Sequence, residues 1–225
     1  MFNPEIQITA DGSHTLFIPE IEEHYHSVNG AIQESLHVYI EAGLNHSKKH
    51  SINVLEYGFG TGLNAFLTSI EAEKRNLNIK YTSLEKYPLP NHITTQLNYT
   101  KEFSDKFQKY FEEIHACNWK KCCQISNNFQ IEKIQTDFSE FQFKEDYDVI
   151  FYDAFAPDKQ SDVWSQTIFN SIFEHTKPEG ILTTYCAKGN IRRMLLSAGF
   201  QVERIPGPPG KREMLRAIKM VQGTG

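Results

Sequence analysis

The sequence predicts an α/β fold: a doubly wound, mainly parallel sheet covered by helices on both faces, with an antiparallel hairpin at its C-terminal end. Two observations support this prediction. Short β-rich apolar runs alternate with longer stretches of helical periodicity along most of the 225 residues. A glycine-rich turn, Gly58 to Gly62, separates the first long strand from the first long helix. Glycines there allow a tight turn and let a ligand approach the main chain.

The expected strands are short apolar runs bounded by turn residues or acids. In chain order they are residues 52–57, 79–85, 122–126, 129–136, 147–152, 181–186, 201–205 and 214–221. The run YDVIFY at 147–152 is the clearest buried strand among them. Asn127 and Asn128 indicate a hairpin or tight connection between their flanking runs. The last two runs, separated by PGPPGKR, are expected to pair with each other as an antiparallel hairpin.

The expected helices are residues 63–75, an uneven stretch ending near His115, 164–175 and 190–198. Gly199 follows the last of them in the manner of a C-cap. Aromatic residues at helical spacing within the uneven stretch are expected in the core rather than around a ligand. These are Phe103, Phe107, Tyr110 and Phe111.

The chain is expected to divide into residues 1–50, an irregular N-terminal arm and helix that close the site, and residues 51–225, the α/β domain. Its 40% hydrophobic content is too high for a disordered chain, and no long uncharged run indicates a membrane span. The N-terminus lacks a basic stretch followed by an apolar segment. We therefore expect a cytoplasmic protein.

Charge is distributed unevenly along the chain. The net charge is −5, but residues 186–225 carry eight Lys and Arg against two Glu, a local +6. The preceding residues carry 15 basic and 26 acidic side chains, a local −11. An acidic protein is a poor general nucleic-acid binder, whereas a basic C-terminal segment can hold a polyanion locally.

Neither a disulfide framework nor a metal site is expected. Cys117, Cys122 and Cys123 cluster without a C-x-x-C spacing, and Cys186 stands alone, which is typical of reduced intracellular thiols. A site combining His115 with these cysteines, or one using His24 and His26, would need further ligands from elsewhere.

The strongest local motif is EYGFGTGLN, running from Glu56 to Asn64 between a strand and a helix. A dinucleotide fingerprint would need glycine or alanine where Leu63 stands. Acids then follow at the ends of the next strands: Glu85, Asp137 and Asp153. Ligands of doubly wound folds lie beyond the strand C-termini, so these carboxylates are expected to surround one site. An isolated acid at a strand end is also a common solvated turn residue.

The motif G-x-G-x-G, with an acid two residues before it, resembles the first motif of class I S-adenosylmethionine-dependent methyltransferases, a Rossmann-like fold. A narrower resemblance extends from about Gly12 to Lys219. The run DAFAP at 153–157, followed by Trp164, is similar to the methyltransferase domain of the MnmC family, as are Tyr25-His26-Ser27 and Gly210-Lys211-Arg212-Glu213-Met214. Gly30-Ala31 and Glu34-Ser35 also match that family.

The resemblance implies that S-adenosylmethionine methylates the 5-aminomethyl group of a wobble (2-thio)uridine in the tRNA anticodon loop. The cofactor-binding residues it implies are Glu56, Gly58, Gly60, Gly62, Asn64, Glu85 and Asp137. The substrate-binding residues are Phe155, Pro157, Lys211 and Arg212, with Glu34 and Ser35 in an N-terminal lid and Asp153 at the reacting amine. Bifunctional family members continue into a flavin-dependent oxidase domain, and no part of this sequence is expected to supply that activity. We therefore expect methyl transfer only. The aminomethyl substrate would come from a separate oxidase or from a route that installs the aminomethyl group directly.

Methyl transfer requires a neutral amine, although a primary alkylamine is largely protonated at pH 7. Asp153 is expected to orient the amine, with the role of general base left open. Tyr152 and Phe155 are candidates for stacking on the uracil, although strand alternation points one of them into the core. Trp164 is expected to pack on the sheet. A basic set is expected to contact phosphates or form a solvated surface: Lys188, Arg192, Arg193, Arg204, Lys211 and Arg212.

Two other functions remain open at this point. The same fold serves small-molecule amine methyltransferases and aminopropyltransferases, and the basic C-terminal segment argues modestly against them. A non-catalytic RNA-binding protein is the second alternative, and the intact glycine turn and ordered acids argue against it.

Overall fold

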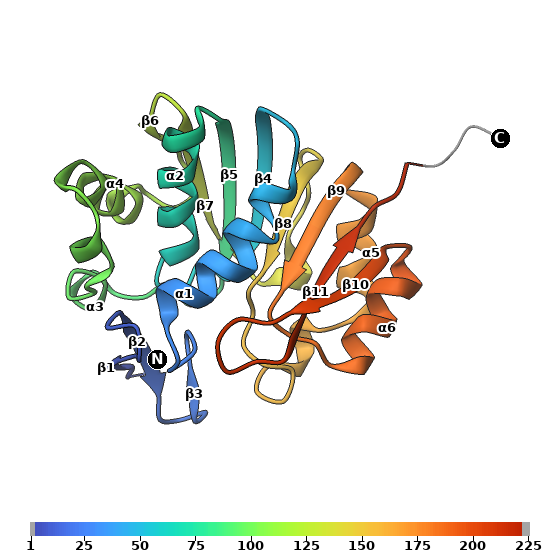
Figure 1. Ribbon diagram of the computed structural model, residues 1–225, viewed down its shortest axis with the longest axis horizontal. Coiled ribbons are helices and arrows are strands. Elements are labelled where there is room, and N and C mark those ends of the chain that lie inside the picture. Colours follow the sequence, from blue (N-terminus) through green and yellow to red (C-terminus); the bar gives the residue numbers. More distant parts are fainter. Residues whose placement is uncertain (1–2, 222–225) are drawn as a thin grey trace.

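A central sheet organises the computed structural model, which describes residues 3–221. Within those residues the sheet has eight strands in the order β10-β11-β9-β8-β4-β5-β7-β6 (Figure 1). The strands are β4 (Ser51–Tyr57), β5 (Asn78–Glu85), β6 (Cys122–Ser126), β7 (Phe129–Gln135), β8 (Tyr147–Tyr152), β9 (Thr176–Thr184), β10 (Gln201–Pro206) and β11 (Glu213–Ile218). The ends of the expected segments 1–50 and 51–225, namely residues 1–2 and 222–225, lie outside the described residues.

The five middle strands run parallel, which confirms the mainly parallel sheet. Antiparallel pairing occurs at both edges: β6 with β7, β11 with β9, and β10 with β11. The expected hairpins at 122–136 and 201–221 are therefore confirmed. All six residues of β8 are buried, because elements cover both faces of the sheet. Strand β9 begins five residues before the expected start at 181 and ends at Thr184, and β11 ends at Ile218.

Two apolar clusters lie on opposite faces of the sheet. Alternation along β4 sends Val54 into one cluster and Leu55 into the other. The first face is covered by α2 (Leu63–Arg75) and α4 (Asp105–Ala116), and the second by α5 (Gln166–Glu174) and α6 (Gly189–Ala198). Gly199 ends α6 in the left-handed conformation, which confirms the expected C-cap.

The uneven helical stretch before His115 is three separate elements: α3 (Asn91–Thr94), the 3₁₀ helix η3 (Tyr99–Glu102) and α4. Its aromatics belong to the core, as expected. Tyr110 and Phe111 are buried, while Phe103 and Phe107 pack against the same cluster. The shorter elements η2 (Leu44–His46), η4 (Phe138–Glu140) and η5 (Ser161–Val163) are single 3₁₀ turns in connections.

The expectation of an irregular N-terminal arm is wrong. A three-stranded antiparallel sheet forms there from β1 (Glu5–Ile8), β2 (His14–Ile18) and β3 (Glu23–His24). Its strands have five residues or fewer, too short for their alternation to stand out in the sequence. A helix follows, α1 (Ala31–Ser35) continuing into the π-helical η1 (Leu36–Glu41), and crosses in front of β4 and β8 in Figure 1.

The cysteine expectation is also wrong for one pair. Cys117 and Cys123 form a disulfide, with their Cα atoms 6.1 Å apart. The chain reverses direction between the end of α4 and the start of β6, which brings the two residues within disulfide range. Cys122 and Cys186 are free, the first exposed and the second buried. None of the helices in residues 3–221 is both long and apolar enough to cross a membrane.

Candidate active site

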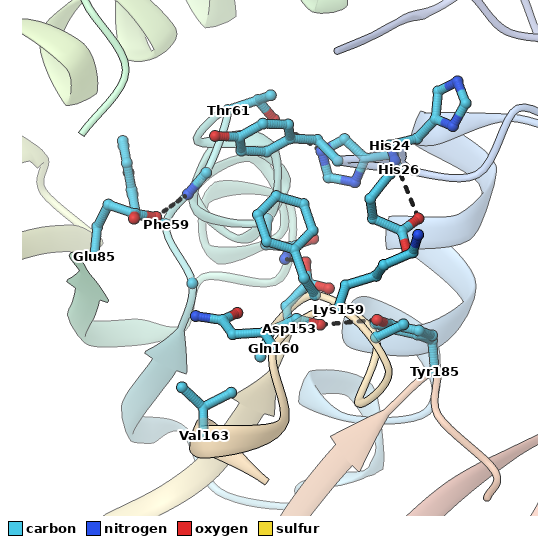
Figure 2. A pocket seen from close by; sticks show the side chains of 18 of the residues that line it. His24, His26, Phe59, Thr61, Glu85, Asp153, Lys159, Gln160, Val163 and Tyr185 are labelled. Carbon is cyan, nitrogen blue, oxygen red and sulfur yellow. Dashed lines mark hydrogen bonds between the residues drawn. The ribbon is translucent and has the colours of Figure 1, made fainter. Parts of the chain in front are cut away.

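A cavity of about 550 Å³ lies at the carboxyl ends of the parallel strands. Its wall combines the glycine turn after β4, the residues at the ends of β5 and β8, the segment after β9, and the N-terminal segment around His24 and His26 (Figure 2). Four predicted site residues from separate parts of the chain therefore share one wall: Glu34, Glu85, Asp137 and Asp153. This position agrees with the general location of ligands in doubly wound folds.

The glycine turn lies directly against the end of β8. Gly58 has a φ of +98°, and a Cβ there would lie 2.4 Å from the carbonyl oxygen of Asp153. Only glycine permits both that conformation and that approach. Gly58 and Gly60 line the cavity, whereas Gly62 stands at the N-cap of α2 and is outside the lining. The turn thus holds its main chain beside Asp153.

Glu85 fastens the turn from the neighbouring strand. Its Oε2 accepts a hydrogen bond from the Gly60 amide at 3.0 Å, and its Oε1 accepts one from the Tyr87 amide at 2.8 Å. Burial raises the pKa of this carboxyl, while the amide hydrogen bonds act in the opposite direction. Each carboxylate oxygen has a second lone pair, so Glu85 can still accept hydrogen bonds from the hydroxyl groups of a ligand in the cavity.

Asp137 is held ionised at the end of β7. Its Oδ2 pairs with Lys86 Nζ at 2.7 Å, and its Oδ1 accepts hydrogen bonds from the amide and hydroxyl of Ser139. The Lys86 hydrogen bond, followed by those of Ser139, lowers the pKa of Asp137 to about 2. This residue and Phe138 both line the cavity.

Asp153 is fixed from two sides. The Tyr39 hydroxyl donates to its Oδ1 at 2.6 Å, and Asn64 Nδ2 donates to its Oδ2 at 2.8 Å. Burial raises the pKa of Asp153 to about 7, against the lowering effect of these two hydrogen bonds. Because a carboxyl with that pKa is partly ionised at neutral pH, it can either accept or hold a proton.

Glu56 lies outside the cavity lining, although it was predicted to contact the cofactor. The residue is fully buried beneath the turn, where its Oε2 accepts a 2.5 Å hydrogen bond from the Ser83 hydroxyl. Burial raises the pKa of Glu56 to about 8. In the structure its carboxyl therefore connects β4 to β5 within the core.

Aromatic side chains form another part of the wall. The rings of Phe155 and Tyr25 pack edge to face with centroids 5.0 Å apart, and both line the cavity. Tyr152 is fully buried, so stacking of its ring on a base is excluded. Trp164 is also buried, as expected, and its indole donates to the Phe155 carbonyl at 2.8 Å. Pro157 lies outside the lining.

Glu34 and Lys211 form an ion pair in the cavity wall. Lys211 Nζ donates to Glu34 Oε1 at 2.7 Å and lies 3.9 Å from the centroid of the Tyr185 ring. The other oxygen, Glu34 Oε2, accepts the Ser27 amide at 2.8 Å. Ser35 is buried outside the lining, and Arg212 is exposed next to Lys211. Lys211 therefore turns inward, and Arg212 remains at the surface.

His26 connects the N-terminal segment to the glycine turn. Its Nε2 lies 2.8 Å from the Thr61 hydroxyl, and burial lowers its pKa to about 4, so the ring is neutral at pH 7. His24 instead contacts Gln7. In the described part of the chain, no group of three or more His, Cys, Asp or Glu side chains is placed to hold a metal.

The predicted basic set does not form one free surface. Lys188 pairs with Asp158, and Arg204 pairs with Glu213 at 2.8 Å. Lys211 is the member that lines the cavity. The local charge of +6 is thus reduced by partners from other parts of the chain, such as Asp158 and Glu34.

The strand order, the glycine turn and the acids at the strand ends define the class of doubly wound α/β proteins that bind a nucleoside-containing ligand at the carboxyl edge of the sheet. Residues 97–220 match the profile of a family described as S-adenosyl-L-methionine-dependent methyltransferase. Since this match covers more than half of the chain, the protein belongs to that family of enzymes.

Similar proteins agree with this assignment. The "tRNA 5-methylaminomethyl-2-thiouridine biosynthesis bifunctional protein MnmC" of Idiomarina loihiensis is 28% identical over a 209-residue alignment that covers 85% of this chain and 34% of that protein. The protein of the same name from Campylobacter hominis is 28% identical over a 210-residue alignment that covers 90% of this chain and 31% of that protein. This chain therefore spans about a third of the length of these relatives.

Solved structures show the same fold. The crystal structure of MNMC2 from Aquifex aeolicus matches with a TM-score of 0.80 at 24% identity, covering 99% of this chain and 72% of that one. Spermidine synthase from Thermotoga maritima matches with a TM-score of 0.54 at 11% identity, covering 97% and 81%. The fold class predicted from the sequence is therefore confirmed.

The cavity residues suit the cofactor that the family uses. Glu85 offers carboxylate oxygens of the kind that pair with ribose hydroxyls, beside a glycine turn close enough to be contacted through its main chain. Asn64 also lines the cavity, where its Nδ2 donates to Asp153 Oδ2, so it connects the start of α2 to the carboxylate that follows β8. Bound S-adenosylmethionine would supply a methyl group on a sulfonium.

Proposed function

We propose that this chain methylates the primary amine of a 5-aminomethyl group on the wobble uridine of tRNA, giving the 5-methylaminomethyl nucleoside. The names of the MnmC relatives support the substrate class. The observation that favours amine chemistry most directly is Asp153, a fixed carboxylate at the cavity wall. An amine nitrogen beside it would donate a hydrogen bond, which points the nitrogen lone pair away from the carboxylate.

Asp153 is suited to lowering the charge of the amine as well as orienting it. An alkylammonium has an ordinary pKa near 10, and an ordinary aspartate has one near 4. With a pKa of about 7, Asp153 is a stronger base than an ordinary aspartate and can take a proton from the bound ammonium. Fixing the carboxylate from two sides also reduces the entropy lost on reaching the reactive geometry.

The remaining wall suits a nucleobase held at the end of β8. Phe155 presents an aromatic ring for stacking, and Tyr25 supports that ring.

We include residues 1–50 as the segment that closes the site, because Tyr25, His26 and Glu34 contribute to the cavity. Arg212, exposed on the same rim, is proposed to contact tRNA phosphate. The proposal places the enzyme in the cytoplasm with tRNA, and assigns supply of the aminomethyl group to a separate enzyme such as an oxidase.

Radiolabelled S-adenosylmethionine tests this proposal when offered with two acceptor pools. One pool is tRNA isolated from cells unable to add the terminal methyl, and the other is a mixture of free primary amines and diamines. We expect label to enter tRNA and not the free amines. Label in the amines alone would establish a small-molecule transferase. Failure to bind S-adenosylmethionine in calorimetry would instead support a non-catalytic RNA-binding protein.

A further inference from the structure

We propose that Glu34 and the ring of Tyr185 form a site for the protonated amine of the substrate, and that Lys211 fills this site until the substrate displaces it. The inference rests on the proposed function and extends it to the way in which the amine is recognised. The three residues come from the N-terminal helix, the segment after β9 and the β10–β11 turn, and all of them line the cavity. We call Glu34 with Tyr185 the amine site.

The contacts of Lys211 Nζ describe what the amine site accepts. The nitrogen donates to Glu34 Oε1 at 2.7 Å and lies over the Tyr185 ring at 3.9 Å from its centroid. A carboxylate combined with an aromatic face is a recognised environment for an alkylammonium. Lysine and a 5-aminomethyl group both end in a primary amine on a methylene carbon. The same contacts therefore suit the substrate amine.

Glu34 requires a cationic partner. Its side chain is 8% exposed, and its Oε2 is already occupied by the Ser27 amide. A buried carboxylate without a partner cation is strongly unfavourable, so Oε1 is expected to stay paired before and after substrate binding. Exchange of one ammonium for another preserves that pairing. A neutral substituent of similar size would leave Glu34 unpaired or fail to displace Lys211.

The ammonium group of Lys211 is placed so that it can move out of the amine site. It follows Gly210 in the β10–β11 connection, and Gly210 has a φ of +85° and lies against Asn29 of the N-terminal segment. The side chain of Lys211 remains 34% exposed, so its ammonium can move toward water or RNA phosphate. The charges of Glu34 and Lys211 both influence the pKa of Asp153, Glu34 raising it and Lys211 lowering it. The Tyr185 hydroxyl donates to the carbonyl of Ala154, the residue after Asp153, at 2.8 Å, so the amine site adjoins the segment that carries the proposed catalytic carboxylate.

Three synthetic anticodon stem-loops test the inference, differing at the wobble position: 5-aminomethyluridine, 5-hydroxymethyluridine or unmodified uridine. Their dissociation constants are measured in the presence of S-adenosylhomocysteine. Wild type should prefer the aminomethyl RNA over the hydroxymethyl RNA by about tenfold or more, because only the former is charged. Glu34→Gln, which keeps the size and an acceptor for Ser27, should reduce that preference to about onefold.

Lys211→Met provides the second arm. Without the competing cation, the aminomethyl RNA should bind about tenfold tighter than to wild type, while hydroxymethyl and unmodified RNA change little. Arg212→Gln is the matched control because it removes one charge from the same turn. It should weaken the binding of all three RNAs by a similar factor. Thermal unfolding and S-adenosylhomocysteine binding verify that each variant is folded.

Three outcomes would overturn the inference. The first is that wild type binds the aminomethyl and hydroxymethyl RNAs equally well, and the second is that Glu34→Gln leaves the preference for the aminomethyl RNA unchanged. The third is that Lys211→Met weakens the binding of all three RNAs equally. The last would assign Lys211 to phosphate contact. If Glu34→Gln does not fold, Lys211→Met still decides the matter. Methyl transfer by wild type to the aminomethyl RNA is measured in parallel. Its absence would reject the proposed function, whereas its presence with an unchanged preference would reject only the amine site.

Discussion

The phenol of Tyr39 donates a 2.6 Å hydrogen bond to Oδ1 of Asp153, a residue 114 positions further along the chain. Tyr39 lies in the π-helical η1, an irregularity often found near functional sites. This bond stabilises the ionised form of Asp153 and opposes the effect of burial. The position of the proposed catalytic carboxylate thus depends on the N-terminal segment as well as on the strand that bears it.

Tyr39→Phe should shift the pH dependence of methyl transfer. Removal of one hydrogen bond to the carboxylate raises the pKa of Asp153 above its value of about 7, so the ionised fraction at neutral pH falls. We expect kcat at pH 7 to decrease about tenfold and the acidic limb of the pH–rate profile to move to higher pH. The KM for S-adenosylmethionine should stay the same. A lower rate with an unmoved acidic limb would show that Tyr39 serves only packing.

Glu85→Gln should weaken cofactor binding. The amide keeps the shape of the side chain but offers one acceptor oxygen where the carboxylate has two, so the Gly60 and Tyr87 amides and the ligand compete for it. We expect affinity for S-adenosylhomocysteine to fall about tenfold or more in calorimetry. Glu102→Gln, at an exposed carboxylate outside the cavity, is the matched control. Equal affinities for the two variants would contradict a cofactor role for Glu85.

Glu56→Gln should stabilise the protein as pH rises. The folded-state pKa of Glu56, about 8, exceeds the ordinary value of 4.5, so the folded protein retains a proton that the unfolded chain releases. That proton costs stability progressively between the two values, reaching the order of 3 kcal/mol by pH 7. Urea unfolding at pH 5, 6, 7 and 8 should show wild type declining relative to the variant. Parallel stability profiles for the two proteins would contradict a protonated Glu56.

The sheet and the strand-end acids could be predicted because both follow from local patterns. Apolar runs identify the parallel strands, and the topology places the residues after them along one edge. Tyr185 could have been found by the same reasoning, because it directly follows β9. The core position of Glu56 also had a signal, since strand alternation puts it on the same face as Val54, which faces the α2 and α4 core.

Other parts of the site had no local signal. Tyr39 reaches Asp153 because η1 crosses the sheet at a particular position, which depends on tertiary packing. Lys211 was predicted to contact the tRNA backbone or the rim of the site, but its inward position depends on Glu34, which is 177 residues away. Charge counted along the sequence cannot show this, because it omits the partner that neutralises each basic residue.

Nucleoside analysis of tRNA after reaction with wild type and with Asp153→Asn tests the central claim most directly. The substrate is tRNA bearing 5-aminomethyl groups at the wobble uridine, and the readout is mass spectrometry of the digested nucleosides. Wild type should convert that nucleoside to its 5-methylaminomethyl form, and Asp153→Asn should do so at least about a hundredfold more slowly while binding S-adenosylhomocysteine normally. Methylation of a different nucleoside, or a wild-type rate in Asp153→Asn, would contradict the account.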